Sequence, residues 1–178
     1  SNFTTDQAGA DNNGRNLKAT FNFNRLQKIT DKTNILFKFN GQLAADNLDG
    51  GEQFTLGGPN AVRAYAPSEA AGDAGFTTSL ELKRNFFNLP TTLFYDYGQI
   101  RLHKNKWTGW NSTNTDLKNK YALKGWGLSM DVPVFNLFTV QLSHSRTIKG
   151  NSGVDSDGLD VDGLSWDGRT FITLSKQY

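Results

Sequence analysis

Alternation of apolar and polar residues is the main pattern along this chain. After a polar stretch over residues 1–15, which reads as loop, apolar side chains occupy every second position from Leu17 to Phe23, with polar residues between them. A period of two residues puts one set of side chains on each face of a β-strand. No segment shows sustained helical periodicity, so the sequence predicts an all-β chain of about seven strands. The six further alternating segments lie near residues 35–43, 76–83, 93–98, 125–132, 138–143 and 170–178.

The connections between these segments alternate in length. Short turns are expected near 29–33, 86–91 and 133–136, and long loops at 46–74, 103–119 and 149–167. Outer-membrane barrels show this rhythm, with short turns on one side and long external loops on the other. Strands of about 10–12 residues also match the length that crosses the hydrocarbon layer at a tilt. A soluble β-sandwich remains an alternative, although it does not need the long and short rhythm.

Seven is an odd number of strands, whereas a bacterial barrel made of one chain has an even number. The simplest interpretation is that residues 1–178 form the C-terminal part of a larger barrel. The strands at 16–28 and 168–178 are then expected to lack closing partners within the chain. Direct pairing of these two edges into a small closed barrel would contradict the prediction.

Composition excludes several classes of function. The 178 residues carry 19 basic and 17 acidic side chains, and a net charge of +2 gives no case for binding nucleic acid. The chain has no cysteine, so it offers no disulfide, thiolate metal ligand or thiol nucleophile. Mean hydropathy is −0.54, and no apolar run approaches the ~18 residues of a membrane helix. Barrel strands escape such a scan because their polar positions alternate with apolar ones.

Two charges stand out against this pattern. Arg63 lies at the tip of the long glycine-rich loop, and Asp96 lies within the strand segment Phe94–Gly98. Alternation puts Asp96 on the polar face of its strand, and it puts Glu81 on the polar face of an earlier strand. If the strands form a barrel, this face lines the lumen, where a loop arginine can reach the carboxylate. The lipid-facing positions beside Asp96 are then Leu93, Tyr95 and Tyr97.

These segments resemble the TpsB family of haemolysin secretion/activation proteins of the ShlB/FhaC/HecB type, which are outer-membrane transporters of two-partner secretion. The resemblance covers roughly residues 34–178, and the loop and the Phe-x-Asp-x-Gly strand carry most of it. The terminal Tyr178 also fits the last strand of such a barrel. The segments that carry the resemblance are Glu52–Gly58, Val62–Tyr65, Gly72–Gly75, Leu80–Leu82, Phe94–Gly98 and Gly125–Leu128.

The family implies a sixteen-stranded barrel, preceded by periplasmic POTRA domains and a plug helix that the 178 residues do not contain. It implies that the loop at 46–74 folds into the lumen and that Arg63 pairs with Asp96 there. The family usually has glycine after this arginine, and Ala64 would be strained if the position required a positive φ. The implied site consists of the loop-tip motif Val62, Arg63, Ala64 and Tyr65, the partner motif Phe94, Asp96 and Gly98, and the supporting lumen residue Glu81.

The implied function is translocation of a large exoprotein across the outer membrane. The exoprotein would be an adhesin, a haemolysin or a contact-inhibition toxin. The expected partners are this exoprotein, outer-membrane lipid, the rest of the barrel and the POTRA domains. No enzymatic activity, cofactor or metal is implied. A related insertase that assembles other barrels is an alternative.

Other candidate sites are weaker. The acidic segment 155–163 resembles a calcium loop, but an EF-hand needs glutamate at its twelfth position, where Trp166 stands; an external acidic loop is the favoured interpretation. His103 and His144 have no catalytic or metal-binding partner at a useful spacing. Trp107 and Trp110 are expected in an external loop or an aromatic girdle.

Overall fold

The computed structural model describes residues 17–135 and 137–176. The expectations for residues 1–15, for Asn136 and for Tyr178 lie outside them. Most of this part forms one antiparallel sheet with the order β1-β2-β5-β6-β7-β8-β9. The prediction of an all-β chain with seven alternating strands is therefore confirmed. The strands are β1 (Lys18–Thr30), β2 (Thr33–Ala44), β5 (Ala74–Phe86), β6 (Leu89–Arg101), β7 (Lys120–Val134), β8 (Phe138–Thr147) and β9 (Gly168–Lys176).

The two edges of the sheet do not meet. β1 and β9 lie at opposite ends of the strand order, and neither pairs with the other in the described residues. This agrees with the expectation for a sheet that continues beyond these strands. Between β2 and β5 the chain leaves the sheet over residues 45–73, which we call the inner loop. The inner loop contains a single 3₁₀ turn, η1 (Gly50–Glu52), and a small hairpin of β3 (Phe54–Leu56) and β4 (Ala70–Gly72).

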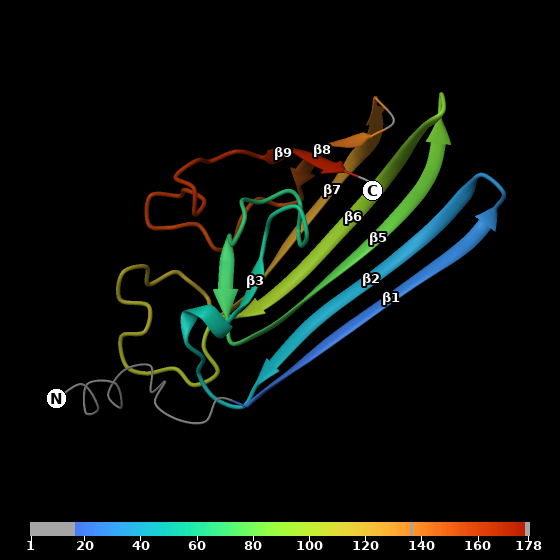
Figure 1. Cartoon of the computed structure of the whole chain (residues 1–178). Coiled ribbons are helices and arrows are strands. Elements are labelled where there is room, and N and C mark those ends of the chain that lie inside the picture. Colours follow the sequence, from blue (N-terminus) through green and yellow to red (C-terminus); the bar gives the residue numbers. More distant parts are fainter. Residues whose placement is uncertain (1–16, 136, 177–178) are drawn as a thin grey trace.

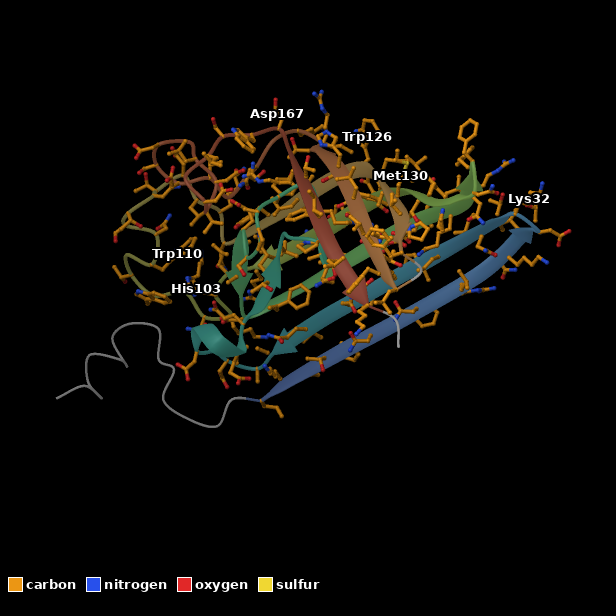
Figure 2. The ribbon with its side chains drawn as sticks, turned by 45° about the horizontal axis from the view of Figure 1, so that its top comes forward. Lys32, His103, Trp110, Trp126, Met130 and Asp167 are labelled. Atoms are coloured by element: carbon orange, nitrogen blue, oxygen red, sulfur yellow. The ribbon has the colours of Figure 1, made fainter. Side chains whose placement is uncertain are left out.

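The short turns lie at one end of the sheet and the long loops at the other (Figure 1). In Figure 2, Lys32 marks the turn end, and His103 and Trp110 mark the loop end. The long loops at this end are the inner loop, residues 102–119 between β6 and β7, and residues 148–167 between β8 and β9. No helix in the described ranges is long and apolar enough to cross a membrane.

One turn is tighter than the sequence indicates. The connection between β5 and β6 consists of Phe87 and Asn88 alone, with φ values of 50° and 63°. Two consecutive positive φ angles are typical of a type I′ hairpin, which phenylalanine does not signal. Pro90 therefore belongs to β6, opposite Asn85, and the predicted turn at 86–91 is too wide. Pro133 likewise lies in β7, opposite Thr139, rather than in a turn.

The sheet is curved, and its two faces differ in character. The inner loop lies on the concave face, inside the trough between the two edges (Figures 1 and 2). The convex face carries exposed apolar side chains on every strand, and Leu93 is 47% exposed while Phe94 beside it is 2% exposed. No second sheet covers the convex face in the described part of the chain. The exposed apolar residues include Phe21, Phe23, Leu80, Leu82, Tyr95, Trp126, Leu128, Leu142, Ile172 and Leu174.

This arrangement does not fit a β-sandwich, in which two sheets bury their apolar faces against each other. Here the apolar face is the one left exposed, and the polar face receives the inner loop. An exposed apolar surface of this extent marks contact with lipid or with another protein.

Candidate functional site

The inner loop folds back sharply so that Arg63 projects toward the sheet. Gly57 and Gly58 both adopt a φ of 88°, and a Cβ on Gly57 would lie only 2.1 Å from the carbonyl oxygen of Ala66. The turn is closed by the Gly58 N–H, which donates to the Tyr65 carbonyl, and by the Tyr65 N–H, which donates to that of Val62. Only glycine accommodates both the positive φ and the close approach. The glycine-rich sequence therefore serves to present residues 62–65.

An apolar cluster fixes the inner loop on the concave face. Strands β6 and β7 and the residue after β6 contribute four side chains that are buried beneath the loop: Ile100, Leu102, Tyr121 and Leu123. Along β6, the inward positions change from polar at Asp96 to apolar at Ile100, near the loop end. Each large apolar side chain buried here stabilises the docked loop by about 1.5–3 kcal/mol relative to exposure. From the loop, the cluster receives Leu56, Val62, Ala64, Tyr65 and Ala70.

Arg63 and Asp96 form a bidentate ion pair at the centre of this face. Arg63 Nε donates to Asp96 Oδ2 at 2.8 Å, and its Nη2 donates to Oδ1 at 2.7 Å. The backbone N–H of Arg63 adds a third bond to Oδ2 at 3.1 Å. The Arg63 side chain is 13% exposed and that of Asp96 is 1% exposed. The pair is thus largely withdrawn from water, where losing one partner typically costs about 3–5 kcal/mol.

Residues of β5 and β6 complete the surroundings of the guanidinium. Arg63 Nη2 donates to the Ser79 hydroxyl at 2.8 Å and lies 3.1 Å from Glu81 Oε1. The Arg63 Cζ atom lies 3.4 Å from the centroid of the Phe94 ring, in the geometry of a cation–π contact. Glu81 also contacts two lysines, Lys38 at 3.0 Å and Lys83 at 3.3 Å.

The remaining motif residues provide space for the loop. A Cβ on Gly98 would lie 2.8 Å from Leu56 Cδ2 and 2.9 Å from Val62 Cγ2. Since real Cβ contacts are longer, glycine at this position lets the loop pack directly on β6 without displacing the Leu56 and Val62 side chains.

Ala64 fits without backbone strain. It does not adopt a positive φ, so the strain that such a φ would have imposed on alanine does not arise. Its methyl group instead points at Gly125 of β7, where a Cβ would lie 2.4 Å from Ala64 Cβ. Gly125 was recognised in the sequence as part of a motif, but its role as the space for Ala64 could not be read from it.

Tyr65 does not contact the ion pair. Its hydroxyl donates to the Gly150 carbonyl at 2.8 Å and lies 3.1 Å from the Lys124 carbonyl. Burial raises the pKa of this hydroxyl to about 12, so it remains a donor at any physiological pH. Arg63, two residues before Tyr65, pairs with Asp96. Tyr65 instead binds the loop to β7 and to the 148–167 loop.

Sequence reasoning missed a buried carboxylate of the inner loop, that of Asp73. Asp73 is fully buried, and its Oδ1 accepts from the Leu48 N–H at 3.0 Å while its Oδ2 accepts from the Lys104 N–H at 2.6 Å. Two to three N–H donors can stabilise a buried carboxylate. Asp73 therefore joins both ends of the inner loop to the 102–119 loop. The Gly72–Gly75 motif is the signal that pointed to this segment.

The carboxylates of the acidic segment 155–163, which resembled a calcium loop in the sequence, form hydrogen bonds and ion pairs within the protein. Asp155 Oδ1 accepts from the backbone N–H groups of Asp157 and Leu159, and Asp160 pairs with Arg169 at 2.7 Å. No group of three metal-binding side chains occurs in the described ranges. The carboxylates of the acidic loop are thus used to shape that loop.

The two histidines and the loop tryptophans also lie in the packed loop region or on the outer face. The His103 ring lies 4.6 Å from that of Trp107 and 5.7 Å from that of Trp110, and burial lowers the pKa of His103. Trp110 packs against the apolar cluster rather than forming part of a lipid-facing girdle. His144 contacts Thr170 on the adjacent strand.

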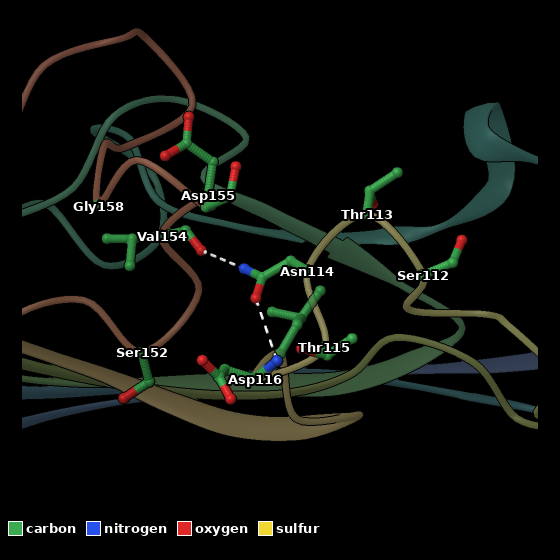
Figure 3. A pocket seen from close by; sticks show the side chains of 11 residues that line it. Ser112, Thr113, Asn114, Thr115, Asp116, Ser152, Val154, Asp155 and Gly158 are labelled. Atoms are coloured by element: carbon green, nitrogen blue, oxygen red, sulfur yellow. Dashed lines mark hydrogen bonds between the residues drawn. The ribbon is translucent and has the colours of Figure 1, made fainter.

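A cavity of about 390 Å³ lies between residues 112–117 and 152–158 (Figure 3). Asn114 closes one side, because its Nδ2 donates to the Val154 carbonyl at 3.0 Å and its Oδ1 accepts from the Asp116 N–H at 3.2 Å. Its walls are polar loop segments with no catalytic arrangement.

Comparison with known proteins identifies the family. Residues 2–130 match the family described as haemolysin secretion/activation protein ShlB/FhaC/HecB. The chain belongs to this family. Among curated relatives, the heme/hemopexin transporter protein HuxB of Haemophilus influenzae strain 86-028NP is 27% identical over 117 residues, which is 63% of this chain and 20% of HuxB. HuxB of strain Rd is 26% identical over the same length. The chain thus spans about a fifth of these relatives.

A solved structure shows the same fold. CdiB from Acinetobacter baumannii superposes with a TM-score of 0.55 and 20% identity, over 89% of this chain and 25% of CdiB. At this identity the likeness concerns the fold alone. The seven-stranded sheet is accordingly part of a β-barrel of the haemolysin secretion/activation type.

Proposed function

We propose that this chain is the C-terminal part of an outer-membrane transporter that moves a large secreted protein out of the cell by two-partner secretion. In this proposal residues 1–178 contribute seven of sixteen strands, and the remaining strands and the POTRA domains come from the rest of the protein. The membership of the haemolysin secretion/activation family supports it. The unpaired edges of β1 and β9 are the positions where the rest of the barrel would join.

In the proposed mechanism, Arg63 latches the inner loop to Asp96 inside the lumen. An exposed ion pair, worth ~0–1 kcal/mol, would be too weak to hold a loop of this length. A bidentate pair withdrawn from water, with Phe94 beside the guanidinium, is much stronger because breaking it strands a buried charge. The buried Arg63–Asp96 pair is the observation that carries this proposal.

The membrane location is supported by the outer face of the sheet. Leu93, Tyr95 and Trp126 belong to a continuous apolar surface that alternates with inward polar positions. Lipid is the natural solvent for such a surface. HuxB is a heme/hemopexin transporter protein by name, and a transport role for this chain requires no catalytic group.

Two alternatives make different predictions. A barrel-assembly insertase would act on other barrel proteins, so its loss would deplete them from the outer membrane. A β-sandwich binding module would remain monomeric in the absence of detergent, which the exposed apolar face argues against.

The test is removal of the full-length protein from its own cell. We expect the exoprotein partner to disappear from the medium and to accumulate in the periplasm, while other outer-membrane barrels stay at their normal level. Immunoblots of medium, periplasm and outer membrane measure all three. Depletion of unrelated barrels would favour the insertase, and unchanged export would overturn the proposal.

A further inference from the structure

The inner loop is also held by the 148–167 loop, away from the Arg63–Asp96 pair. Glu69, near the end of the loop, is 6% exposed and faces the 148–167 loop rather than the strands. Its carboxylate accepts from the backbone N–H of Val161 at 3.3 Å and 3.2 Å, and Asn151 Nδ2 donates to its Oε1. With the bond from Tyr65 to Gly150, the 148–167 loop grips the inner loop at two positions.

The receiving loop is itself braced. Asn151 Nδ2 also donates to Asp160 Oδ1 at 2.9 Å, so one amide lies between the carboxylates of Glu69 and Asp160. Arg169, at the start of β9, donates to Asp160 at 2.7 Å and to Asp162 at 3.0 Å. Since Arg169 and Asp160 are almost fully buried, this bracing is withdrawn from water. The Glu69 carboxylate therefore accepts from a preformed pair of donors, Asn151 and Val161, on a loop that is anchored to the last strand of the sheet.

We propose that Glu69 clasps the inner loop to the 148–167 loop, so that this loop must release Glu69 before the Arg63 tip can leave Asp96. The inference rests on the proposed function, in which the transporter needs the Arg63 tip docked on Asp96, and it adds the contact that has to open before the tip can leave. Glu69 acts as a positioning residue: it touches no transported protein and works through the loop it holds. A partner that binds the 148–167 loop would change the ratio of docked to released Arg63 tip. The size of the change is set by the difference between its affinities for the clasped and released forms.

The clasp is expected to respond to pH. Burial, followed by the charge of Asp160, raises the pKa of Glu69 from 4.5 to about 7. The other groups that act on Glu69 are Asp162 and the hydroxyls of Tyr65 and Tyr121, and Arg169 lies behind Asp160 and Asp162, to which it donates. The clasped form holds the proton more tightly than the released form. Raising the pH from about 4.5 to about 7 therefore weakens the clasp, and above that range the effect levels off.

Hydrogen exchange on the full-length protein in lipid tests the proposal at named amides. In Glu69→Ala, the Val161 amide loses its acceptor and is expected to exchange about tenfold faster at any pH. The Arg63 amide, which donates to Asp96, is expected to exchange at least about twofold faster because the tip is released more often. In the unmodified protein, exchange at Val161, corrected for its chemical rate, is expected to be slower near pH 5 than near pH 8.

Glu69→Gln keeps an acceptor but cannot titrate, so its Val161 amide is expected to stay protected with no dependence on pH. Asp157→Asn removes an exposed carboxylate from the same loop and is expected to reproduce the unmodified pH profile. Unchanged exchange at Val161 and Arg63 in Glu69→Ala, or a pH dependence that survives in Glu69→Gln, would overturn the clasp. These readouts do not use secretion, so the clasp can fail while the transport proposal stands, and the reverse.

Discussion

Replacing Arg63 with alanine in the full-length protein is expected to remove most secretion while leaving insertion into the outer membrane intact. Asp96 would keep only the backbone N–H of residue 63 and would be left as a buried, uncompensated charge. Such a change costs about 3–5 kcal/mol, which lowers the docked population of the loop relative to the released one by about two to four orders of magnitude. The strands do not depend on the pair for their hydrogen bonds, so the barrel should still assemble. The measurement is exoprotein in the medium, normalised to transporter in the outer membrane.

The matched control is Arg146→Ala, which removes an exposed guanidinium from the outer face of β8 and is expected to secrete normally. Asp96→Ala should resemble Arg63→Ala, and the double variant should be no worse than either, because the two residues act as one unit. Full secretion by Arg63→Ala would argue against the latch.

Adding a single methyl group at Gly125 is expected to push the loop tip off the sheet. In Gly125→Ala the new Cβ would lie 2.4 Å from Ala64 Cβ and 3.0 Å from the Arg146 carbonyl. Overpacking of this kind costs about 1–3 kcal/mol, so the docked loop is expected to lose about one to two orders of magnitude in population. Protease sensitivity of the inner loop and secretion both report this change.

The structure offers both a rescue and a control for this substitution. Ala64→Gly removes the opposing methyl group, so Ala64→Gly combined with Gly125→Ala should recover most of the lost secretion. Gly50→Ala adds the same group where no atom lies within 4 Å, and it should behave as the unmodified protein. Failure of the combined variant to recover any function would show that the Ala64–Gly125 contact does not position the tip.

The strands could be predicted from the sequence because alternation is a local property. Each of the seven segments contains its own apolar and polar faces, and the sequence therefore placed Asp96 and Glu81 on the inward side without knowledge of their neighbours. The turn boundaries were less accurate. Phe87 adopts a positive φ, and its identity gives no sign of this because the hairpin geometry is fixed by the strands on either side.

Contacts between distant segments could be predicted only where a family motif marked them. The Arg63–Asp96 pair was expected from the resemblance, since alternation alone gives a direction but no distance. Glu69 and Asn151 are separated by 82 positions, and neither belongs to a periodic segment, so no local pattern signals their contact. Ile100 and Leu102 carried a weak signal, because they continue the inward positions of Asp96 and Gly98 with apolar side chains.

Cysteine cross-linking tests most directly whether the loop tip lies against β6 inside the barrel. The 178 residues contain no cysteine. A Cβ on Gly98 would lie 2.9 Å from Val62 Cγ2. If the Cγ2 position is taken by the sulfur of a cysteine at 62, this separation suits the Cβ of one cysteine and the Sγ of the other in a disulfide. In full-length protein without other cysteines, Val62→Cys with Gly98→Cys is expected to cross-link under mild oxidation and to block secretion until reductant is added. The control pair, Val62→Cys with Leu93→Cys, places the second thiol on the outer face of the same strand and should stay reduced. Absence of the cross-link in correctly inserted Val62→Cys/Gly98→Cys protein would contradict a loop docked in the lumen.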